Sequence, residues 1–540
     1  MLPTKPHQIK TALVSITSLY VAGWGFYYLA QETIRRRELA SRKRKYPLRA
    51  PLLPPHAISA GVRVAERVGV LAHTNSKGSS SSSSPDQLEA KKILKQRGLP
   101  DASEHNEEAD ALSPPATPTR GPSWYGGATD SEVSRIHRRF SSLKVLGRYA
   151  NVVPEWREQG VWEWAAWKLC YSLFYKPRIW WDGGFKADQK THEGRQKIDM
   201  LLPVERIKWD QLFASSGTAA TDSNGPTPPA VREAAQSSFT WIGQSTCLIQ
   251  LEGVTILTDP VFSKQPVVSV FSPTRMRPMP CNIHELVANA AIDVVLLTHN
   301  HFDHLDIHVL PLIPKRATFI VPVGLAPLLQ QYGVEATRIV ELDWWQQRRL
   351  PLSIRVASKD NGSSGGDTTT IERRRCFDVT AVPASHWSAR TPLDTNTTLW
   401  NSYAVRVYTD DQASTAPRSC SPSSAVTEPR SLFFCGDTGY SPSLFTAIGR
   451  ALGPFDVACL PIGSYEPRWH MQIQHMHVTE SVQVTRDIGS RRAFAMHWGT
   501  WSMSDETWDD PYWQLHKELR QTSDDPERLL AVPFGKTFWF

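Results

Sequence analysis

Residues 298–306, with the sequence THNHFDHLD, constrain the fold of this 540-residue chain more than any other stretch. They follow the apolar run DVVLL, which has the composition of a buried strand. Alternate side chains of an extended segment share a face, so His299, His301 and Asp303 can point into one cavity, and the following turn brings His304 to the same place. Such a group of imidazoles and carboxylates suits zinc and would stay unsatisfied without a cation. The spacing therefore indicates a metal-binding turn after a strand, rather than a surface loop that happens to be rich in histidine.

Three further candidate ligands each follow a predicted strand. His386 comes after FDVTAV, Asp437 after LFFC and His497 after AFAM. Alone, each would more often be a capping or hydrogen-bonded residue than a ligand. Taken in order after the first motif, they give His-x-His-x-Asp-His, His, Asp, His, which completes a site for two metal ions.

The N-terminus carries a different signal. Residues 12–30 are apolar and uncharged, and nineteen helical residues at about 1.5 Å each reach across about 28 Å, enough for a hydrocarbon core. We therefore expect a single-pass membrane anchor; a secretory signal peptide is the competing interpretation, but no small-x-small cleavage site follows.

Basic residues follow this segment, at 35–37 and 42–45, whereas only Lys5 and Lys10 precede it. The asymmetry predicts that the body of the protein lies on the cytosolic or matrix side, held against an anionic lipid surface. Residues 1–31 contain no acid, which also fits a mitochondrial targeting element. We favour a mitochondrial, inner-membrane location, with the endoplasmic reticulum as the alternative.

Composition divides the chain into three parts. Residues 1–49 form the expected anchor with its basic flank, and residues 50–144 are predicted to be a disordered linker because they are rich in Ser, Pro and charge. Residues 145–540 are predicted to be one hydrolase domain with polar loop insertions near 358–375 and 410–430. Seven cysteines without a Cys-x-x-Cys pair favour a reducing compartment.

Several longer motifs carry a resemblance to a known family. THNHFDHLD, ELDWW, PASHWSARTPLD, FFCGDTGYSP, PIGSYEPRWHM and AMHWGT resemble the N-acylphosphatidylethanolamine-hydrolysing phospholipases D of the metallo-β-lactamase superfamily. The resemblance runs, with gaps, from about residue 145 to the C-terminus. It implies an α/β fold, the αβ/βα sandwich of two packed mixed sheets flanked by helices.

The resemblance also implies roles, residue by residue. His299, His301 and His386 match the ligands of one zinc ion, Asp303, His304 and His497 those of a second, and Asp437 the carboxylate that bridges both. Gln474 and His475 match a pair near the substrate phosphate, so His475 joins Asp303 as a catalytic candidate, although His477 is an alternative because the neighbouring residues depart from the family. Asp306 is a candidate to orient an imidazole, or else a plain surface carboxylate.

The activity implied by the resemblance is hydrolysis of N-acylphosphatidylethanolamine, a membrane phospholipid, to N-acylethanolamine and phosphatidic acid by a hydroxide held between two zinc ions. A homodimer is also compatible with it. A tRNA-processing nuclease would share the metal pattern, but much of the net charge of +7 lies beside the N-terminal segment, so we expect no nucleic-acid partner. A lactonase or thioesterase would share the pattern too, and a lipid-binding scaffold without catalysis is the candidate from a non-enzyme class.

Overall fold

The computed structural model describes residues 6–48, 129–159, 163, 166–171, 182–213, 232–233, 237–267, 272–359, 368–391, 393–409, 429–522 and 525–540, and for residues 6–22, 24, 169–171, 232–233, 355–359 and 368–371 only the backbone. The described residues belong to one compact unit. The expected linker falls for the most part outside the described residues.

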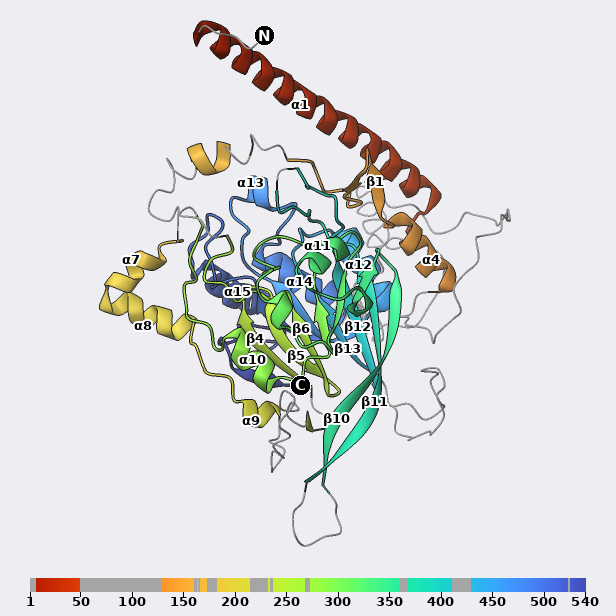
Figure 1. The fold of residues 1–540 in the computed structure, drawn as a ribbon, viewed down its shortest axis with the longest axis vertical. Helices are drawn as coiled ribbons and strands as arrows, with labels where there is room; N and C mark the ends of the chain where they lie inside the picture. Colours follow the sequence, from red (N-terminus) through yellow and green to blue (C-terminus); the bar gives the residue numbers. More distant parts are fainter. Residues whose placement is uncertain are drawn as a thin grey trace, which may run out of the picture. The chain divides into compact units, whose positions relative to one another are not determined.

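Two mixed sheets form the centre of the unit (Figure 1). The seven-stranded sheet has the order β17-β4-β5-β6-β7-β8-β9. Its strands are β4 (Ser238–Gly243), β5 (Thr246–Leu251), β6 (Val254–Thr258), β7 (Val294–Leu296), β8 (Thr318–Pro322), β9 (Ile339–Leu342) and β17 (Thr537–Trp539). The hairpins at β4, β5 and β6 pair antiparallel, whereas β6 to β9 run parallel because helical and loop crossovers connect them.

The eight-stranded sheet has the order β16-β15-β14-β13-β12-β11-β10-β3. Its strands are β3 (Arg232–Glu233), β10 (Gln347–Lys359), β11 (Thr368–Val382), β12 (Ser402–Thr409), β13 (Arg430–Phe434), β14 (Phe455–Pro461), β15 (Ser490–Met496) and β16 (Leu529–Leu530). A separate hairpin pairs β1 (Leu143–Val145) with β2 (Arg148–Ala150).

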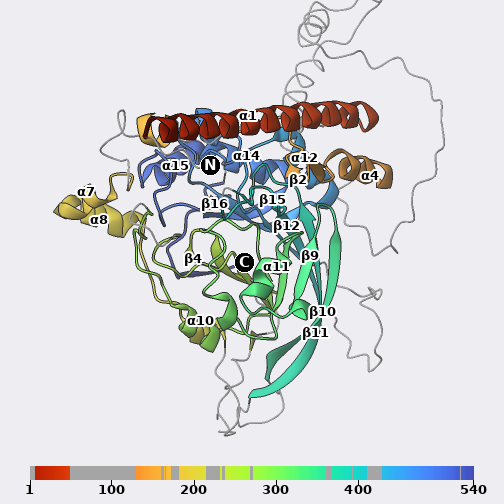
Figure 2. The same ribbon diagram turned by 45° about the horizontal axis from the view of Figure 1, so that its top comes forward.

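Helices lie outside both sheets (Figures 1 and 2). The longer ones beside the eight-stranded sheet are α12 (Pro442–Leu452), α14 (Val478–Asp487) and α15 (Asp510–Gln521), and those beside the seven-stranded sheet are α10 (Ile283–Asn289) and α11 (Ala326–Gln331). The remaining helices are α1 (Pro6–Lys45), α4 (Asp130–Arg139), η1 (Ala166–Tyr171), α7 (Phe185–Lys190), α8 (His192–Leu201), α9 (Trp209–Leu212), η2 (Leu310–Leu312), η3 (Ala336–Arg338) and α13 (Arg468–Met471). The arrangement is the helix–sheet–sheet–helix sandwich expected from the sequence.

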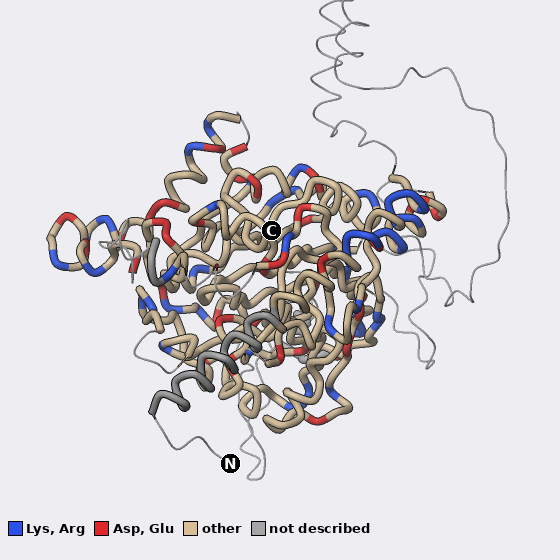
Figure 3. The backbone as a smooth tube through the Cα atoms, turned by 90° about the horizontal axis from the view of Figure 1, so that it is seen from above, with Lys and Arg blue, Asp and Glu red and all other residues tan. Residues whose placement is uncertain are grey.

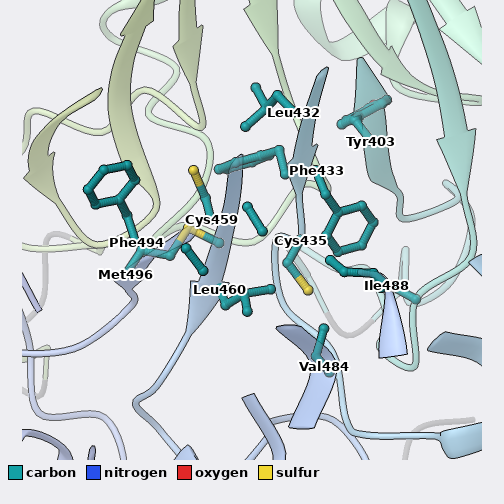
Figure 4. Packing of buried hydrophobic residues seen from close by; sticks show 14 of the residues in the cluster. Tyr403, Leu432, Phe433, Cys435, Cys459, Leu460, Val484, Ile488, Phe494 and Met496 are labelled. Carbon is teal, nitrogen blue, oxygen red and sulfur yellow. The ribbon is translucent and has the colours of Figure 1, made fainter. Parts of the chain in front are cut away.

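Strand β7 shows why the sequence folds in this way. Val294 and Leu296 belong to the core cluster that includes the space between the sheets, and Val295 and Leu297 to the cluster beneath the outer helices. Successive side chains of a strand point to opposite faces, so a strand buried on both sides must be apolar throughout. Figure 4 shows the same close packing around β13, β14 and β15, with Phe433, Leu460 and Phe494 among the buried residues.

Four described cysteines, Cys247, Cys281, Cys435 and Cys459, are free and buried, as small core residues. Cys376 on β11, in contrast, is disulfide-bonded. The cysteine pattern, which favours a reducing compartment, does not indicate this disulfide. The reason is that sequence spacing does not show which cysteines a long antiparallel hairpin brings near other parts of the chain.

The N-terminal segment forms helix α1, which continues past the expected end of the anchor to Lys45. Within the part of the chain whose side chains the structure describes, no helix is long and apolar enough to cross a membrane, so the expected single-pass anchor receives no support. Most of the anchor's side chains, residues 12–22 and 24, lie outside that described part. Beyond them the helix carries polar groups, including Gln31 and Arg35, which are 1% and 2% exposed.

Arg35 attaches α1 to the rest of the fold. Its guanidinium donates to the backbone oxygens of Val153 at 3.2 Å and Trp156 at 2.7 Å, and it pairs with Glu32 at 2.7 Å. Two turns further on, Arg42 donates to the backbone oxygen of Ser141 at 2.5 Å. The C-terminal part of α1 is thus held to the fold by hydrogen bonds from charged donors, which are stronger than neutral ones.

The folded unit also begins earlier than residue 145. Helix α4 has Thr129 as its N-cap, and Arg450 on α12 pairs with Glu132 at 2.6 Å. The end of the predicted linker is therefore ordered, because its amphipathic pattern buries Val133 and Ile136. Within the first predicted insertion, β11 already begins at Thr368, whereas residues 410–428 of the second lie outside the described residues.

Candidate metal centre

The candidate ligands lie at one edge of the sandwich, where strands from both sheets end. The 298–306 turn follows β7 of one sheet, and His386, Asp437 and His497 follow β11, β13 and β15 of the other. Carboxyl ends of parallel strands meet at the same edge of a sheet, which explains how residues nearly 200 positions apart in the chain converge.

Three histidines form the first ligand group. His299 Nε2 lies 2.8 Å from His301 Nδ1, and that atom lies 3.2 Å from His386 Nε2. All three rings offer a nitrogen to the same point, and these nitrogens lie within 4.8 Å of one another. The spacing suits a single ion bound by three imidazoles.

The second group combines two carboxylates and two histidines. His304 Nε2 and His497 Nε2 each lie 3.0 Å from Asp437 Oδ2. The distance to Asp303 Oδ2 is 3.4 Å from His304 Nε2 and 3.3 Å from His497 Nε2. Asp437 Oδ2 is also 3.9 Å from His386 Nε2 of the first group. Asp437 is thus the carboxylate placed between the two groups, as the resemblance implied.

Burial and charge set opposite protonation tendencies in the two groups. Burial lowers the pKa of His301 to about 4 and that of His386 to about 3. Burial acts in the same direction on His497, but the Asp437 and Asp303 carboxylates outweigh it and raise its pKa to about 9. Without a cation, protons on the second group would be the positive charge that offsets the two carboxylates.

Within the described part of the chain, several buried polar atoms at this edge lack a hydrogen-bond partner. They include His304 Nε2, His497 Nε2 and Asp437 Oδ1. Buried polar atoms are nearly always paired, so a cluster of orphans made of imidazole and carboxylate marks a place where a cation is the missing partner. The residues present therefore fit two divalent metal ions.

Asp259, at the end of β6, orients one ligand and was not among the candidates predicted from the sequence. Its fully buried carboxylate lies 2.8 Å from His304 Nδ1 and accepts from the hydroxyl of Thr298 at 2.7 Å and from the backbone N–H of Thr298 at 2.8 Å. A carboxylate on the far ring nitrogen fixes the tautomer that directs Nε2 toward a metal. The Thr-Asp-Pro sequence after a strand was the available signal.

Asp306, the candidate for orienting an imidazole, instead holds a loop in place. It accepts hydrogen bonds from the backbone of Phe262 and from both the backbone and hydroxyl of Ser263, and these partners are not imidazoles. It is not a plain surface carboxylate either, because it is 6% exposed and holds the loop after β6 against the metal turn.

Two amides support the ligands from outside the motifs. Gln244, in the turn between β4 and β5, donates to Asp303 Oδ2 at 2.9 Å. Asn151 Nδ2 donates to the backbone oxygen of His386 at 2.6 Å, across 235 positions of sequence. Neither has a local sequence signal, since an amide beside a strand is common on any protein surface.

The predicted substrate-site pair also lies at this edge. His475 Nδ1 is 3.8 Å from Asp437 Oδ2, and Gln474 accepts from the indole N–H of Trp387 at 2.7 Å. Both are nearly buried, at 8% and 7% exposed. His477, in contrast, is the N-cap of α14, where its ring accepts from the backbone N–H of Thr479 at 3.2 Å. The geometry thus places His475, not His477, beside the candidate ligands.

Close packing explains the glycine after Cys435. Gly436 has a φ of +61°, and a Cβ there would lie 2.6 Å from the Cγ2 atom of Thr298. Only glycine allows Asp437 to approach the metal turn in this backbone conformation.

The fold and this site define a metal-dependent hydrolase. A model of the beta-lactamase superfamily domain matches residues 254–498, which span every candidate ligand. An uncharacterised protein of Mycobacterium bovis is 36% identical over 308 residues. The match covers 56% of this chain and 68% of the relative. The chain therefore belongs to the metallo-β-lactamase superfamily of hydrolases.

Within that superfamily the chain is similar to two phospholipases. The mitochondrial N-acyl-phosphatidylethanolamine-hydrolyzing phospholipase D of Saccharomyces cerevisiae is 29% identical over 421 residues, covering 74% of this chain and 77% of the relative. N-acyl-phosphatidylethanolamine-hydrolyzing phospholipase D 1 of Caenorhabditis elegans is 29% identical over 357 residues. The match covers 64% of this chain and 82% of the relative.

Proposed function

We propose that this chain is a phospholipase D that hydrolyses N-acylphosphatidylethanolamine to N-acylethanolamine and phosphatidic acid. The observation that carries the proposal is the buried convergence of five histidines and two aspartates at one sandwich edge. Similarity to two phospholipases of that activity, extending well beyond the ligand motifs, supports the substrate class.

Two zinc ions are the proposed cofactors. His299, His301 and His386 would hold one, Asp303, His304 and His497 the other, and Asp437 would contact both. Bound in this way, the pair supplies a water of lowered pKa and positive charge for the phosphate oxygens. Asp303 and Asp437 neutralise that charge, while Asp259 and Gln244 keep His304 and Asp303 in position.

His475 is proposed to bind the substrate phosphate. Burial lowers the pKa of His475 to about 3, so at neutral pH the imidazole is uncharged and offers one N–H donor. Because the imidazole is uncharged, it does not form an ion pair with Asp437. Its N–H can therefore donate a hydrogen bond to a phosphate oxygen. Gln474, whose side chain is held by Trp387, would fix the direction of approach.

The partners and location belong to the same proposal. A lipid substrate requires a membrane surface, and the basic C-terminal part of α1 is suited to anionic head groups. The mitochondrial relative in yeast supports a mitochondrial location. We propose no nucleic-acid partner, and a homodimer is a compatible assembly.

The test is a paired measurement of metal content and substrate range. Purified full chain should contain about two zinc equivalents and release N-acylethanolamine from N-acylphosphatidylethanolamine in mixed micelles. Asp303→Asn should nearly abolish that release while leaving the folded state intact. Zinc-replete protein that is inert on this lipid but cleaves another phosphodiester or an ester would refute the substrate assignment.

A further inference from the structure

A pocket lies away from the metal centre, where the C-terminal ends of α1 and α4 meet the turn before β10. Its volume is about 390 Å³. Its lining combines basic, hydroxyl and aromatic side chains, namely Glu38, Ser41, Arg42, Lys45, Tyr46, His137, Arg138, Ser141, Trp344 and Trp345. Pockets of this size hold small ligands, and the mixture of an aromatic floor with a few polar groups is typical of them.

The pocket carries a surplus of positive charge. Arg42 is balanced by Glu38 at 2.9 Å and by the Ser141 carbonyl. Lys45 and Arg138 are exposed at the rim, and among the residues that the structure describes neither pairs with a carboxylate. Arg138 lies over the Tyr46 ring, 5.8 Å from its centroid. The pocket therefore presents two cations that no described carboxylate neutralises.

The surrounding helices reinforce this field. The last turn of α1 contains Arg42, Lys43, Arg44 and Lys45, and that of α4 contains His137, Arg138 and Arg139. Figure 3 shows Lys and Arg gathered where these two helices meet. Each helix C-terminus contributes only about half a negative charge, so the cations exceed what the two helix dipoles require.

The imidazole of His137 lines the same pocket. The ring of His137 stacks on Trp345 at 4.7 Å between centroids, with the planes 22° apart. Its Nε2 atom is buried without a hydrogen-bond partner among the described residues. A lining imidazole with an unused nitrogen is what an anionic oxygen would satisfy.

We propose that this pocket binds a phosphate group, with Lys45 and Arg138 as its counter-ions and Ser41 and His137 as neutral donors. A phosphate monoester carries up to two negative charges, which matches the two unpaired cations. Its source is either the head group of an anionic phospholipid such as phosphatidic acid, or a soluble phosphate compound. The site is separate from the proposed catalytic centre and does not depend on the proposed substrate.

Calorimetric titration of the full chain tests the proposal. The probes are inorganic phosphate, glycerol phosphate, short-chain phosphatidic acid below its micelle concentration, and short-chain phosphatidylcholine as the neutral reference. At least one phosphate monoester should bind, and phosphatidylcholine should not. Raising the salt concentration should weaken the binding because the rim cations are exposed.

Two pocket variants separate this site from phosphate bound at the metal centre. Lys45→Gln with Arg138→Gln removes the charge, and Ser41→Trp fills the pocket without changing the charge; each should weaken binding by about tenfold or more. Lys190→Gln with Lys536→Gln, at exposed positions elsewhere, is the matched control and should bind as the native chain does. The melting profile of each variant shows whether it is folded. If Ser41→Trp does not fold, the Lys45→Gln, Arg138→Gln variant still tests the site, because both residues are exposed.

The outcomes are distinct. Binding of phosphatidic acid alone identifies a lipid head group, whereas equal binding of inorganic phosphate identifies a soluble ligand, and either supports the site. The proposal is overturned if no phosphate monoester binds at millimolar concentration, or if both pocket variants bind as tightly as the control.

Discussion

At the scale of single residues, Asp259 illustrates how the metal turn is held in place. It receives hydrogen bonds from both the backbone and the side chain of Thr298 while it contacts His304. The aspartate therefore links the end of β6 to the turn after β7, so the ligand geometry depends on two strands rather than on one motif.

Replacing Asp259 should weaken metal binding without removing a ligand. Asp259→Asn should reduce zinc affinity by about 10- to 100-fold, because the amide no longer holds the His304 tautomer. Competition with a chromophoric chelator measures this. Asp378→Asn, at a buried carboxylate paired with Arg349, is the matched control and should leave affinity unchanged. Unaltered affinity in Asp259→Asn would exclude the orienting role.

His475 and His477 can be separated by substitution. His475→Gln should reduce the turnover number on N-acylphosphatidylethanolamine by about 10²- to 10³-fold, because the donor beside Asp437 is lost. His477→Asn should retain activity, since asparagine also caps a helix N-terminus. Steady-state kinetics of the two variants decide the matter. The reverse pattern would move the substrate-site role to His477.

At the scale of elements, α1 is a packed part of the fold. Arg35 joins it to the segment 151–156 across 121 positions of sequence, and Asn151 of that segment supports the backbone of His386. Arg35 also donates to the backbone oxygen of Asn151 at 3.4 Å, so two hydrogen bonds connect α1 to the candidate ligand His386.

The attachment of α1 should depend on Arg35 and not on its neighbour. Arg35→Met should lower the free energy of unfolding by about 3 kcal/mol, because buried carbonyl oxygens and Glu32 lose their partner. Arg36→Met removes a 71% exposed arginine that also pairs with Glu32, and should cost less than about 1 kcal/mol. Urea denaturation measures both. Equal effects would mean that the buried contacts contribute nothing.

Helix α4 should make the fold sensitive to acid. Burial lowers the pKa of His137 from 6.5 to about 4. Between these values the unfolded chain binds a proton that the folded chain does not, so stability falls as the pH drops through this window and is unaffected above it. The full loss is on the order of 3 kcal/mol.

His137→Phe should remove that part of the acid sensitivity. Denaturation midpoints at pH 7 and pH 4, in buffers without phosphate, measure the difference between the variant and the native chain. His192→Gln, at an exposed position of α8, is the control and should behave as the native chain does. An unchanged pH dependence in His137→Phe would contradict the burial argument.

At the scale of the whole molecule, the two sheets meet at the ligand cluster. The turn after β7 belongs to one sheet, and His386, Asp437 and His497 to the other. An ion bound between them would connect the two halves of the sandwich, so metal binding should contribute to global stability.

Removing metal should lower the melting temperature. Treatment with a chelator should reduce Tm by several degrees and zinc should restore it, since each tenfold excess over the dissociation constant adds about 1.4 kcal/mol. Differential scanning calorimetry measures the shift. A His299→Gln, His497→Gln double variant should show little response to either treatment. A native chain that melts equally with and without chelator would show that no ion joins the sheets.

The sequence predicted the candidate ligands, and its resemblance to a known family predicted the fold class. The strand pattern before residues 298–306 and the later His386, Asp437 and His497 could be recognised because metal chemistry needs particular side chains at strand ends, a local signal. The sandwich was implied by the family resemblance, and the structure shows strands whose apolar residues face both ways, as such a sandwich requires.

Only the tertiary structure decided which neighbours support that site. Asp259 lies 45 positions from His304 and Asn151 lies 235 positions from His386, and no spacing rule connects such pairs. The same holds for Arg35, whose chain position suggested a membrane flank and whose buried contacts instead join α1 to the fold. Candidate ligands can be recognised in short segments of sequence. Their hydrogen-bond partners, and the contacts that attach α1 to the fold, depend on how distant segments pack.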